Sequence, residues 1–98
     1  MRLCRYIAFT VYVLFSKSTQ KFYCGQTDDF ELRISRHNAG IVKSTKNGSP
    51  WIKIWTLNVA TRTEALALER KIKKRGISRY LIDAGVEIKI EVPRIDED

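Results

Sequence analysis

The chain has 98 residues and a mass of 11.4 kDa, which is enough for one domain with a single core. Hydrophobic residues make up 44% of it and charged residues 30%, a balance typical of globular and not of disordered proteins. No apolar run approaches the roughly 18 residues of a membrane span, and no signal-peptide pattern is expected. Cys4 and Cys24 match neither a metal-ligand spacing nor a disulfide framework, so we expect the protein to be located in a reducing cytoplasm.

The charge is distributed unevenly along the sequence. Lys and Arg number 18 against 11 Asp and Glu, so the net charge is +7. Residues 1–80 hold 16 of the basic and 5 of the acidic side chains, whereas residues 81–98 are acidic. A strongly basic body favours a polyanionic partner such as nucleic acid. The alternative is that the charge serves solubility alone.

The first predicted elements form a hairpin. Residues 10–15 alternate between two apolar faces and therefore predict a strand. The polar segment 16–20 predicts a turn, and residues 21–24 predict a second strand that ends at Gly25. The expected faces of the first strand are Val11, Val13 and Phe15 on one side and Tyr12 and Leu14 on the other.

A helix is expected after the hairpin. Thr27 can cap its first turn, and Asp28 and Asp29 follow where the helix dipole favours acidic groups. The helix should end just before Gly40, because glycine suits the position after a helix. Residues 41–50 are then expected to form a polar, basic loop.

The second half of the chain predicts fewer strands and more helix. Its expected elements are a strand over 52–59 with Trp51 and Trp55, a helix over 63–75 capped by Thr63 and ended by Gly76, a short helix over 78–84, and a short strand or extended tail over 86–92. Two neighbouring strands followed by helix, strand and helix predict an α+β fold with a small, mostly antiparallel sheet. We expect one domain over residues 1–98.

A carboxylate is predicted on the apolar side of the later helix. With Ala65 at 0° and an advance of about 100° per residue, the apolar arc includes Leu66, Leu68 and Ile72. Glu69 falls at about 40°, inside this arc, and Glu64 falls outside it, towards water. Because an unpaired buried carboxylate is costly, Glu69 should either pair with a nearby Lys or Arg or bind a metal or substrate.

The earlier helix also carries polar groups on its apolar side. Phe30, Ile34 and His37 follow a helical spacing, and Arg33 flanks the same stripe. His37 could be a core residue with satisfied hydrogen bonds, and Arg33 could extend its charged end to solvent. Arginine is also suited to bidentate contact with phosphate, so the two residues together favour a cleft.

Two tripeptides on the predicted hairpin carry a family resemblance. Thr10-Val11-Tyr12 and Tyr23-Cys24-Gly25 resemble the two signature tripeptides of the GIY-YIG nuclease superfamily, and their tyrosines also fit as ordinary strand residues. The match continues through Arg33, His37 and Glu69, and segments within 42–51 and 63–74 look like the small stand-alone bacterial members. It covers residues 10–82 and leaves 83–98 as an acidic extension. The N-terminal nuclease domain of the excinuclease branch is related, with a Lys where this chain has Gln26.

The resemblance implies a three-stranded antiparallel sheet flanked by helices and a metal-dependent DNA endonuclease, structure-selective and related to repair. It assigns catalytic roles to Tyr12, Tyr23, Arg33, His37 and Glu69. Glu69 would be the ligand of one Mg²⁺ or Mn²⁺ ion, and Arg33 would hold the scissile phosphate. Tyr12 would take a proton from the attacking water or position it, with Tyr23 and His37 assisting.

Basic side chains outside this set are candidates for contacts with the DNA backbone. These are Lys43, Lys46, Lys71, Lys73, Lys74 and Arg75, each of which could equally belong to a solvated face. The alternative to an endonuclease is a nucleic-acid-binding module on the same fold with little or no cleavage.

Overall fold

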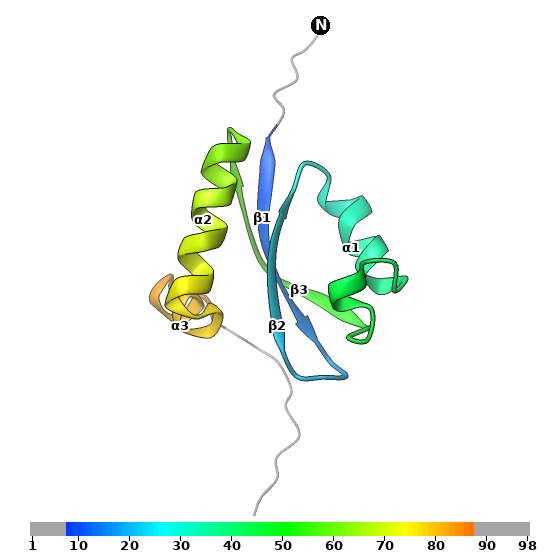
Figure 1. Ribbon diagram of the computed structural model, residues 1–98. Coiled ribbons are helices and arrows are strands. Elements are labelled where there is room, and N and C mark those ends of the chain that lie inside the picture. The colour runs from blue at the N-terminus through cyan, green and yellow to red at the C-terminus, as the bar shows by residue number, and fades with distance from the viewer. Residues whose placement is uncertain (1–7, 88–98) are drawn as a thin grey trace, which may run out of the picture.

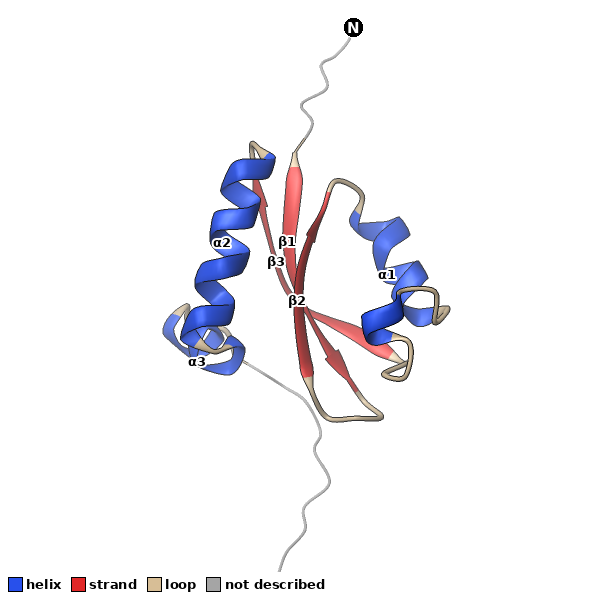
Figure 2. Cartoon of the chain, in the orientation of Figure 1, coloured by secondary structure: helices blue, strands red, loops and turns tan. Residues whose placement is uncertain are grey.

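The computed structural model describes residues 8–87 as a three-stranded sheet with helices on both faces (Figure 1; Figure 2). The elements follow one another as β1 (Phe9–Ser16), β2 (Phe22–Thr27), α1 (Phe30–Asn38), a 3₁₀ turn (Lys43–Thr45), β3 (Trp51–Val59), α2 (Arg62–Arg75) and α3 (Ile77–Asp83). The strand order is β2-β1-β3, and both strand pairs are antiparallel. The predicted α+β class and three-stranded antiparallel sheet are confirmed.

The central strand β1 is buried on both faces, as its apolar alternation predicted. Val11 and Val13 pack into a core with side chains of α2 and α3. Tyr12 and Leu14 point to the opposite face, where they form a second cluster with Trp51 and side chains of α1. A polar group on β1 is therefore shielded from water unless it reaches the edge of the sheet.

Three predicted element boundaries are wrong, each for a local reason: the end of β2 and the starts of α1 and α2. The second strand does not end at Gly25, because Gly25 pairs with Tyr12 and the strand continues to Thr27. The cap of α1 is Asp29 and not Thr27, since the Asp29 side chain accepts a hydrogen bond from the Leu32 N–H.

The cap of α2 is Thr61 and not Thr63. Its hydroxyl accepts a hydrogen bond from the Glu64 N–H, and the Glu64 carboxylate accepts one from the Thr61 N–H, which is a capping box. Glu64 is exposed, as predicted, but it also fixes the start of this helix. Gly76 ends α2 with a φ of 100°, a conformation that glycine adopts without strain.

The phase of α2 is confirmed at its centre and wrong at one margin. Ala65 and Ile72 are fully buried and Leu68 is half-buried, whereas Leu66 is exposed. The tail predicted over 86–92 lies largely outside the described residues. Among the described residues, no helix has both the length and the apolar character that crossing a membrane requires.

Candidate active site

A chain of polar side chains runs from β1 through α1 into the 41–50 segment. The Tyr12 hydroxyl lies 2.9 Å from His37 Nε2, and His37 Nδ1 lies 2.6 Å from Thr45 Oγ1. Tyr12 and His37 are both fully buried, so these contacts satisfy groups that water does not reach.

The contacts determine how the protons are arranged. Thr45 Oγ1 lies 3.4 Å from the Val42 carbonyl, which can accept its proton. We therefore place the His37 proton on Nδ1, which donates a hydrogen bond to Thr45. The Tyr12 hydroxyl keeps its proton and donates a hydrogen bond to His37 Nε2. This assignment requires a neutral imidazole. Burial, followed by the nearby charge of Arg33, lowers the pKa of His37 from 6.5 to about 4, so the ring is neutral at physiological pH.

Arg33 approaches the same tyrosine from one turn earlier on α1. Its Nε–H donates to the Tyr12 hydroxyl at 3.4 Å, and its side chain is half-buried. Burial of Tyr12 raises the pKa of its hydroxyl to about 12, although the hydrogen bond from Arg33 opposes this rise. The hydroxyl is therefore protonated in the resting protein.

Gly25 makes room for the Tyr12 hydroxyl. The two residues are paired across β1 and β2, and a Cβ added to Gly25 would lie 2.6 Å from the Tyr12 oxygen. The same Cβ would lie 3.1 Å from the Tyr23 ring. The tyrosine-x-glycine pattern on β2 thus has a packing cause: any larger residue would displace one or both tyrosines.

Tyr23 connects the buried cluster to the open edge of the sheet. Its ring centroid lies 5.1 Å from that of His37 and 6.3 Å from that of Tyr12. The Tyr23 ring is half-buried, and it lies on β2, an outer strand of the sheet. It is therefore placed to contact a bound molecule and the buried residues at once.

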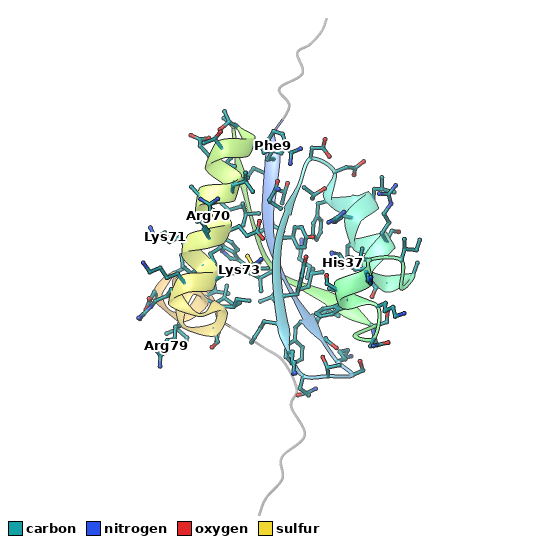
Figure 3. The ribbon with its side chains drawn as sticks, viewed as in Figure 1. Phe9, His37, Arg70, Lys71, Lys73 and Arg79 are labelled. Carbon is teal, nitrogen blue, oxygen red and sulfur yellow. The ribbon has the colours of Figure 1, made fainter. Side chains whose placement is uncertain are left out.

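Glu69 reaches the same edge of the sheet from α2. Its side chain is 19% exposed and forms an ion pair with Lys73, with 2.6 Å between Oε2 and Nζ. The Lys73 ammonium also lies 6.0 Å from the Tyr23 ring centroid, and Figure 3 shows Lys73 between α2 and β2. The predicted placement of Glu69 is confirmed, and one of the two proposed partners, a nearby Lys, is present.

The contacts join the five predicted catalytic residues into one cluster. Tyr12, His37 and Arg33 are linked by hydrogen bonds, and Tyr23 packs against the first two. Glu69 enters from the other side through Lys73, and its negative charge adds a smaller contribution, behind burial, to the raised pKa of Tyr12. Their catalytic roles stay predictions.

The donor atoms at this edge can be tested against the divalent metal that the resemblance implies. Within residues 8–87, no three His, Cys, Asp or Glu side chains gather to hold a metal ion. Glu69 offers one carboxylate, and Gln26 has a buried side-chain oxygen that accepts no hydrogen bond in the described part of the chain.

Gln26 and Cys24 share one face of β2, because side chains alternate along a strand, and Cys24 packs in the core formed with α2. Burial, followed by the charge of Glu69, raises the pKa of the Cys24 thiol to about 12, so it is a poor ligand. Oxygen donors in small number fit Mg²⁺ or Mn²⁺, which retain several waters and share substrate phosphates. The residues therefore fit such an ion, provided that Lys73 releases Glu69.

The predicted DNA-contacting residues lie on different surfaces. Lys43 lines a pocket beside Tyr23, and Lys46 and Lys74 are exposed. Lys73 faces the cluster, whereas Lys71 and Arg75 lie about 200° and 240° around α2 from Glu69. Arg75 pairs there with Asp83 at 2.7 Å. These contacts stay predictions, and Lys73 is the one best placed for the cluster.

Sequence reasoning missed the functions of Thr45 and Gly25. Thr45 holds His37 from a loop, and no pattern in the sequence marks a loop hydroxyl as the partner of a distant histidine. Gly25 was part of the tripeptide that carried the resemblance, which was a usable signal for more than a strand end.

The fold and this cluster define a small α+β domain with a polar site at one edge of its sheet. Residues 8–80 match the family model of the GIY-YIG catalytic domain, which covers well over half of the chain. The chain therefore belongs to the GIY-YIG family, a family of the nuclease type. None of the curated proteins matches it.

A solved structure supports the same fold. The solution NMR structure of a UPF0213 protein from Bacillus halodurans is similar, with a TM-score of 0.51 and 26% sequence identity. The match covers 81% of this chain and 86% of that one. The likeness therefore extends over most of both chains.

Proposed function

We propose that the chain is a divalent-metal-dependent endonuclease that hydrolyses phosphodiester bonds in DNA. The observation that supports this proposal is the hydrogen-bonded series Arg33–Tyr12–His37–Thr45, with Glu69 close enough for its negative charge to act on Tyr12. It combines a phosphate-binding cation, a route for a proton and a metal-binding carboxylate. A repair-related role and a cytoplasmic location belong to the same proposal.

The Tyr12 hydroxyl moves the proton in this mechanism. With a pKa of about 12, it is not deprotonated in advance at neutral pH. Tyr12 instead takes a proton from the attacking water while its own proton passes to His37 Nε2, 2.9 Å away. The water oxygen forms the new bond to phosphorus. The bond from phosphorus to the leaving oxygen breaks, and that oxygen keeps the electron pair and takes a proton from solvent.

Thr45 and Arg33 support that transfer from either side. Thr45 accepts a hydrogen bond from His37 Nδ1–H. This bond keeps the ring proton on Nδ1, so Nε2 is free to receive the proton from Tyr12. Arg33 donates one N–H to Tyr12, and the rest of its guanidinium is suited to the oxygens of the scissile phosphate. The negative phosphate also offsets the positive charge that His37 gains.

Glu69 would hold the metal ion. A bound divalent cation supplies positive charge that stabilises the phosphate as negative charge develops on it. Lys73 must leave Glu69 for this to happen, and its ammonium is then available to a neighbouring phosphate. Binding of DNA and exposure of Glu69 are therefore coupled through one lysine.

The second candidate function is nucleic-acid binding without cleavage. Two observations favour it: the Tyr12 side chain is fully buried, and the Glu69 carboxylate is already paired with Lys73. If neither group becomes available when DNA binds, the basic body still binds the backbone but the site stays inactive.

Cleavage assays on the parent protein and its Tyr12→Phe variant test the two candidate functions. Labelled linear, gapped and branched DNA is incubated with the protein and Mg²⁺ or Mn²⁺, with EDTA as the blank. Tyr80→Phe is the matched control, because Tyr80 packs against Trp55 on the other face of the sheet. We expect Tyr12→Phe to lose at least about 100-fold in rate, the range of general acid–base catalysis, with Tyr80→Phe unaffected.

Each outcome has a definite meaning. Cleavage by Tyr12→Phe at the parent rate contradicts the proton route. DNA binding by the parent protein, with no product from any substrate in either metal, supports the second candidate.

A further inference from the structure

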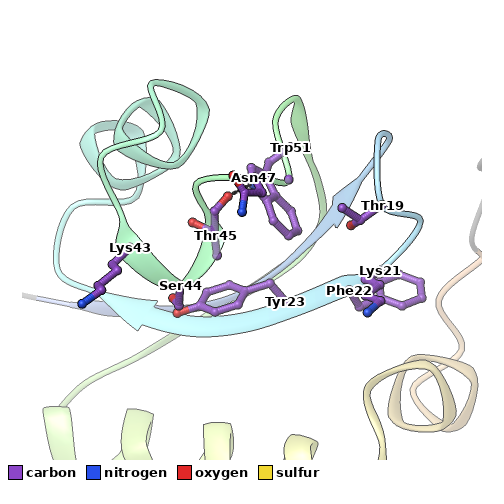
Figure 4. Close-up of a pocket in the computed structure, with 10 residues that line it drawn as sticks. Thr19, Lys21, Phe22, Tyr23, Lys43, Ser44, Thr45, Asn47 and Trp51 are labelled. Atoms are coloured by element: carbon purple, nitrogen blue, oxygen red, sulfur yellow. Dashed lines mark hydrogen bonds between the residues drawn. The ribbon is translucent and has the colours of Figure 1, made fainter.

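A polar pocket lies directly beside the catalytic cluster, on the α1 side of the sheet. Its volume is about 240 Å³, and it opens between the β1–β2 turn, the start of β2 and the 41–50 segment (Figure 4). The lining residues are Thr19, Lys21, Phe22, Tyr23, Lys43, Ser44, Thr45, Asn47, Gly48 and Trp51. The pocket therefore shares Tyr23 and Thr45 with the cluster, whereas Tyr12, His37 and Arg33 do not line it.

The lining combines three kinds of group. The half-buried Tyr23 offers aromatic surface, with the buried Trp51 at the pocket wall. Ser44 and Asn47 offer hydrogen-bonding groups, and two lysines stand near the ends of the pocket. Within the described part of the chain, no carboxylate lines it. This combination suits a nucleotide, whose base stacks on an aromatic ring and whose phosphates meet cations.

The size of the pocket restricts the occupant. A cavity of about 150 Å³ holds a benzene ring, so 240 Å³ leaves room for a single base but not for a base pair. A paired base enters only if it leaves the double helix, at a cost of a few kcal/mol in unstacking and unpairing. The pocket therefore favours nucleotides that are already unpaired.

Tyr23 fixes where the base lies relative to the reaction. Its ring contacts the rings of His37 and Tyr12 on one side, and it lines the pocket on the other. A base stacked on Tyr23 is therefore close to the phosphate held by Arg33.

We propose that this pocket binds the base of an unpaired DNA nucleotide next to the scissile phosphate. The inference rests on the proposed function and narrows its substrate to DNA with an unpaired nucleotide, such as a gap, a flap or a single strand. Lys21 and Lys43 hold the phosphates of that strand, and Ser44 and Asn47 contact the base or the sugar.

Binding of two single-stranded oligonucleotides of equal length tests the proposal. One carries its bases and the other is abasic throughout, so that they differ in bases and not in phosphates. Affinity is measured by fluorescence anisotropy with the full chain in EDTA, which prevents cleavage. We expect the intact strand to bind about 5- to 150-fold more tightly, the equivalent of about 1–3 kcal/mol of base–aromatic stacking.

A matched pair of variants locates the effect. Ser44→Leu fills the pocket, and Ser35→Leu adds the same side chain to the exposed face of α1. Ser44→Leu should remove most of the preference for the intact strand, and Ser35→Leu should keep it. Equal binding of both strands by the parent protein, or a preference that survives Ser44→Leu, overturns the proposal.

Cleavage is scored separately. A preference for bases with no metal-dependent cleavage keeps the pocket and rejects the nuclease. Cleavage with equal rates on continuous duplex and gapped DNA keeps the nuclease and rejects the pocket.

Discussion

Acidification should destabilise the fold through His37, the one histidine of the chain. Its imidazole is fully buried, and burial, followed by the charge of Arg33, lowers its pKa from 6.5 to about 4. Between these two pH values the unfolded chain takes up a proton that the folded chain excludes. The stability that neutral His37 provides is therefore complete above pH 6.5 and is lost as the pH falls towards 4.

The size of this loss follows from the folded and unfolded pKa values. The linkage relation gives about 2 kcal/mol between pH 7 and pH 5, and about 3 kcal/mol by pH 4. Carboxylates also titrate in this range, so a reference protein is needed. The variant His37→Gln keeps a hydrogen-bonding side chain but has no group that takes up the proton, and the carboxylate contributions largely cancel between the two proteins.

Urea unfolding of both proteins at pH 7 and pH 5 measures the effect. The parent should lose about 2 kcal/mol more than His37→Gln between these pH values. Because the chain has one histidine, its NMR ring signal also gives the pKa directly. Equal losses in the two proteins, or a ring pKa at or above 6.5, would show that burial does not keep His37 neutral.

Three further predictions concern packing, capping and the ion pair. Gly25→Ala should lose about 1–3 kcal/mol of stability and most cleavage activity, because its Cβ would lie 2.6 Å from the Tyr12 oxygen. Urea unfolding and parallel cleavage assays measure both effects, and unchanged stability and cleavage would contradict the close approach. Glu64→Ala should cost about 1 kcal/mol in thermal unfolding through loss of the capping box, with cleavage retained, and a cleavage defect would mean that the phase of α2 is misassigned. Lys73→Gln should bind Mn²⁺ more tightly than the parent in calorimetry without DNA, because Glu69 is then unpaired. Lys71→Gln makes the same charge change on another side of α2 and should change the Mn²⁺ affinity little. Equal effects of the two variants would show that only overall charge matters.

The sequence predicted those parts of the site that depend on helical or strand phase. The spacing of the earlier helix placed His37 on the apolar side, where it is fully buried. The angle of Glu69 on the later helix placed its carboxylate towards the sheet, where 19% of the side chain is exposed. In both cases the information is local, because a regular element fixes which residues share a face.

The missed parts depend on contacts between distant segments. Gly25 was interpreted as a strand end because glycine usually weakens a strand, but its cause lies across the sheet in Tyr12. Thr45 becomes the partner of His37 only when the 41–50 segment folds over α1.

The wrong helix caps have a different cause. Each helix start offers more than one side chain of suitable chemistry, and a cap must be the residue just before the helical backbone begins. Thr27 still belongs to β2 and Thr63 already lies within α2, so the caps fall at Asp29 and Thr61.

Cleavage by the Glu69→Gln variant shows whether the Glu69 edge of the sheet is the active site. Nicking of supercoiled DNA in Mn²⁺ is compared among the parent, Glu69→Gln and Glu64→Gln, which makes the same chemical change on the exposed side of the same helix. We expect Glu64→Gln to cut at close to the parent rate and Glu69→Gln to be at least about 100-fold slower, with its fold intact. Parental cutting by a folded Glu69→Gln protein would contradict the claim that this edge of the sheet is the active site.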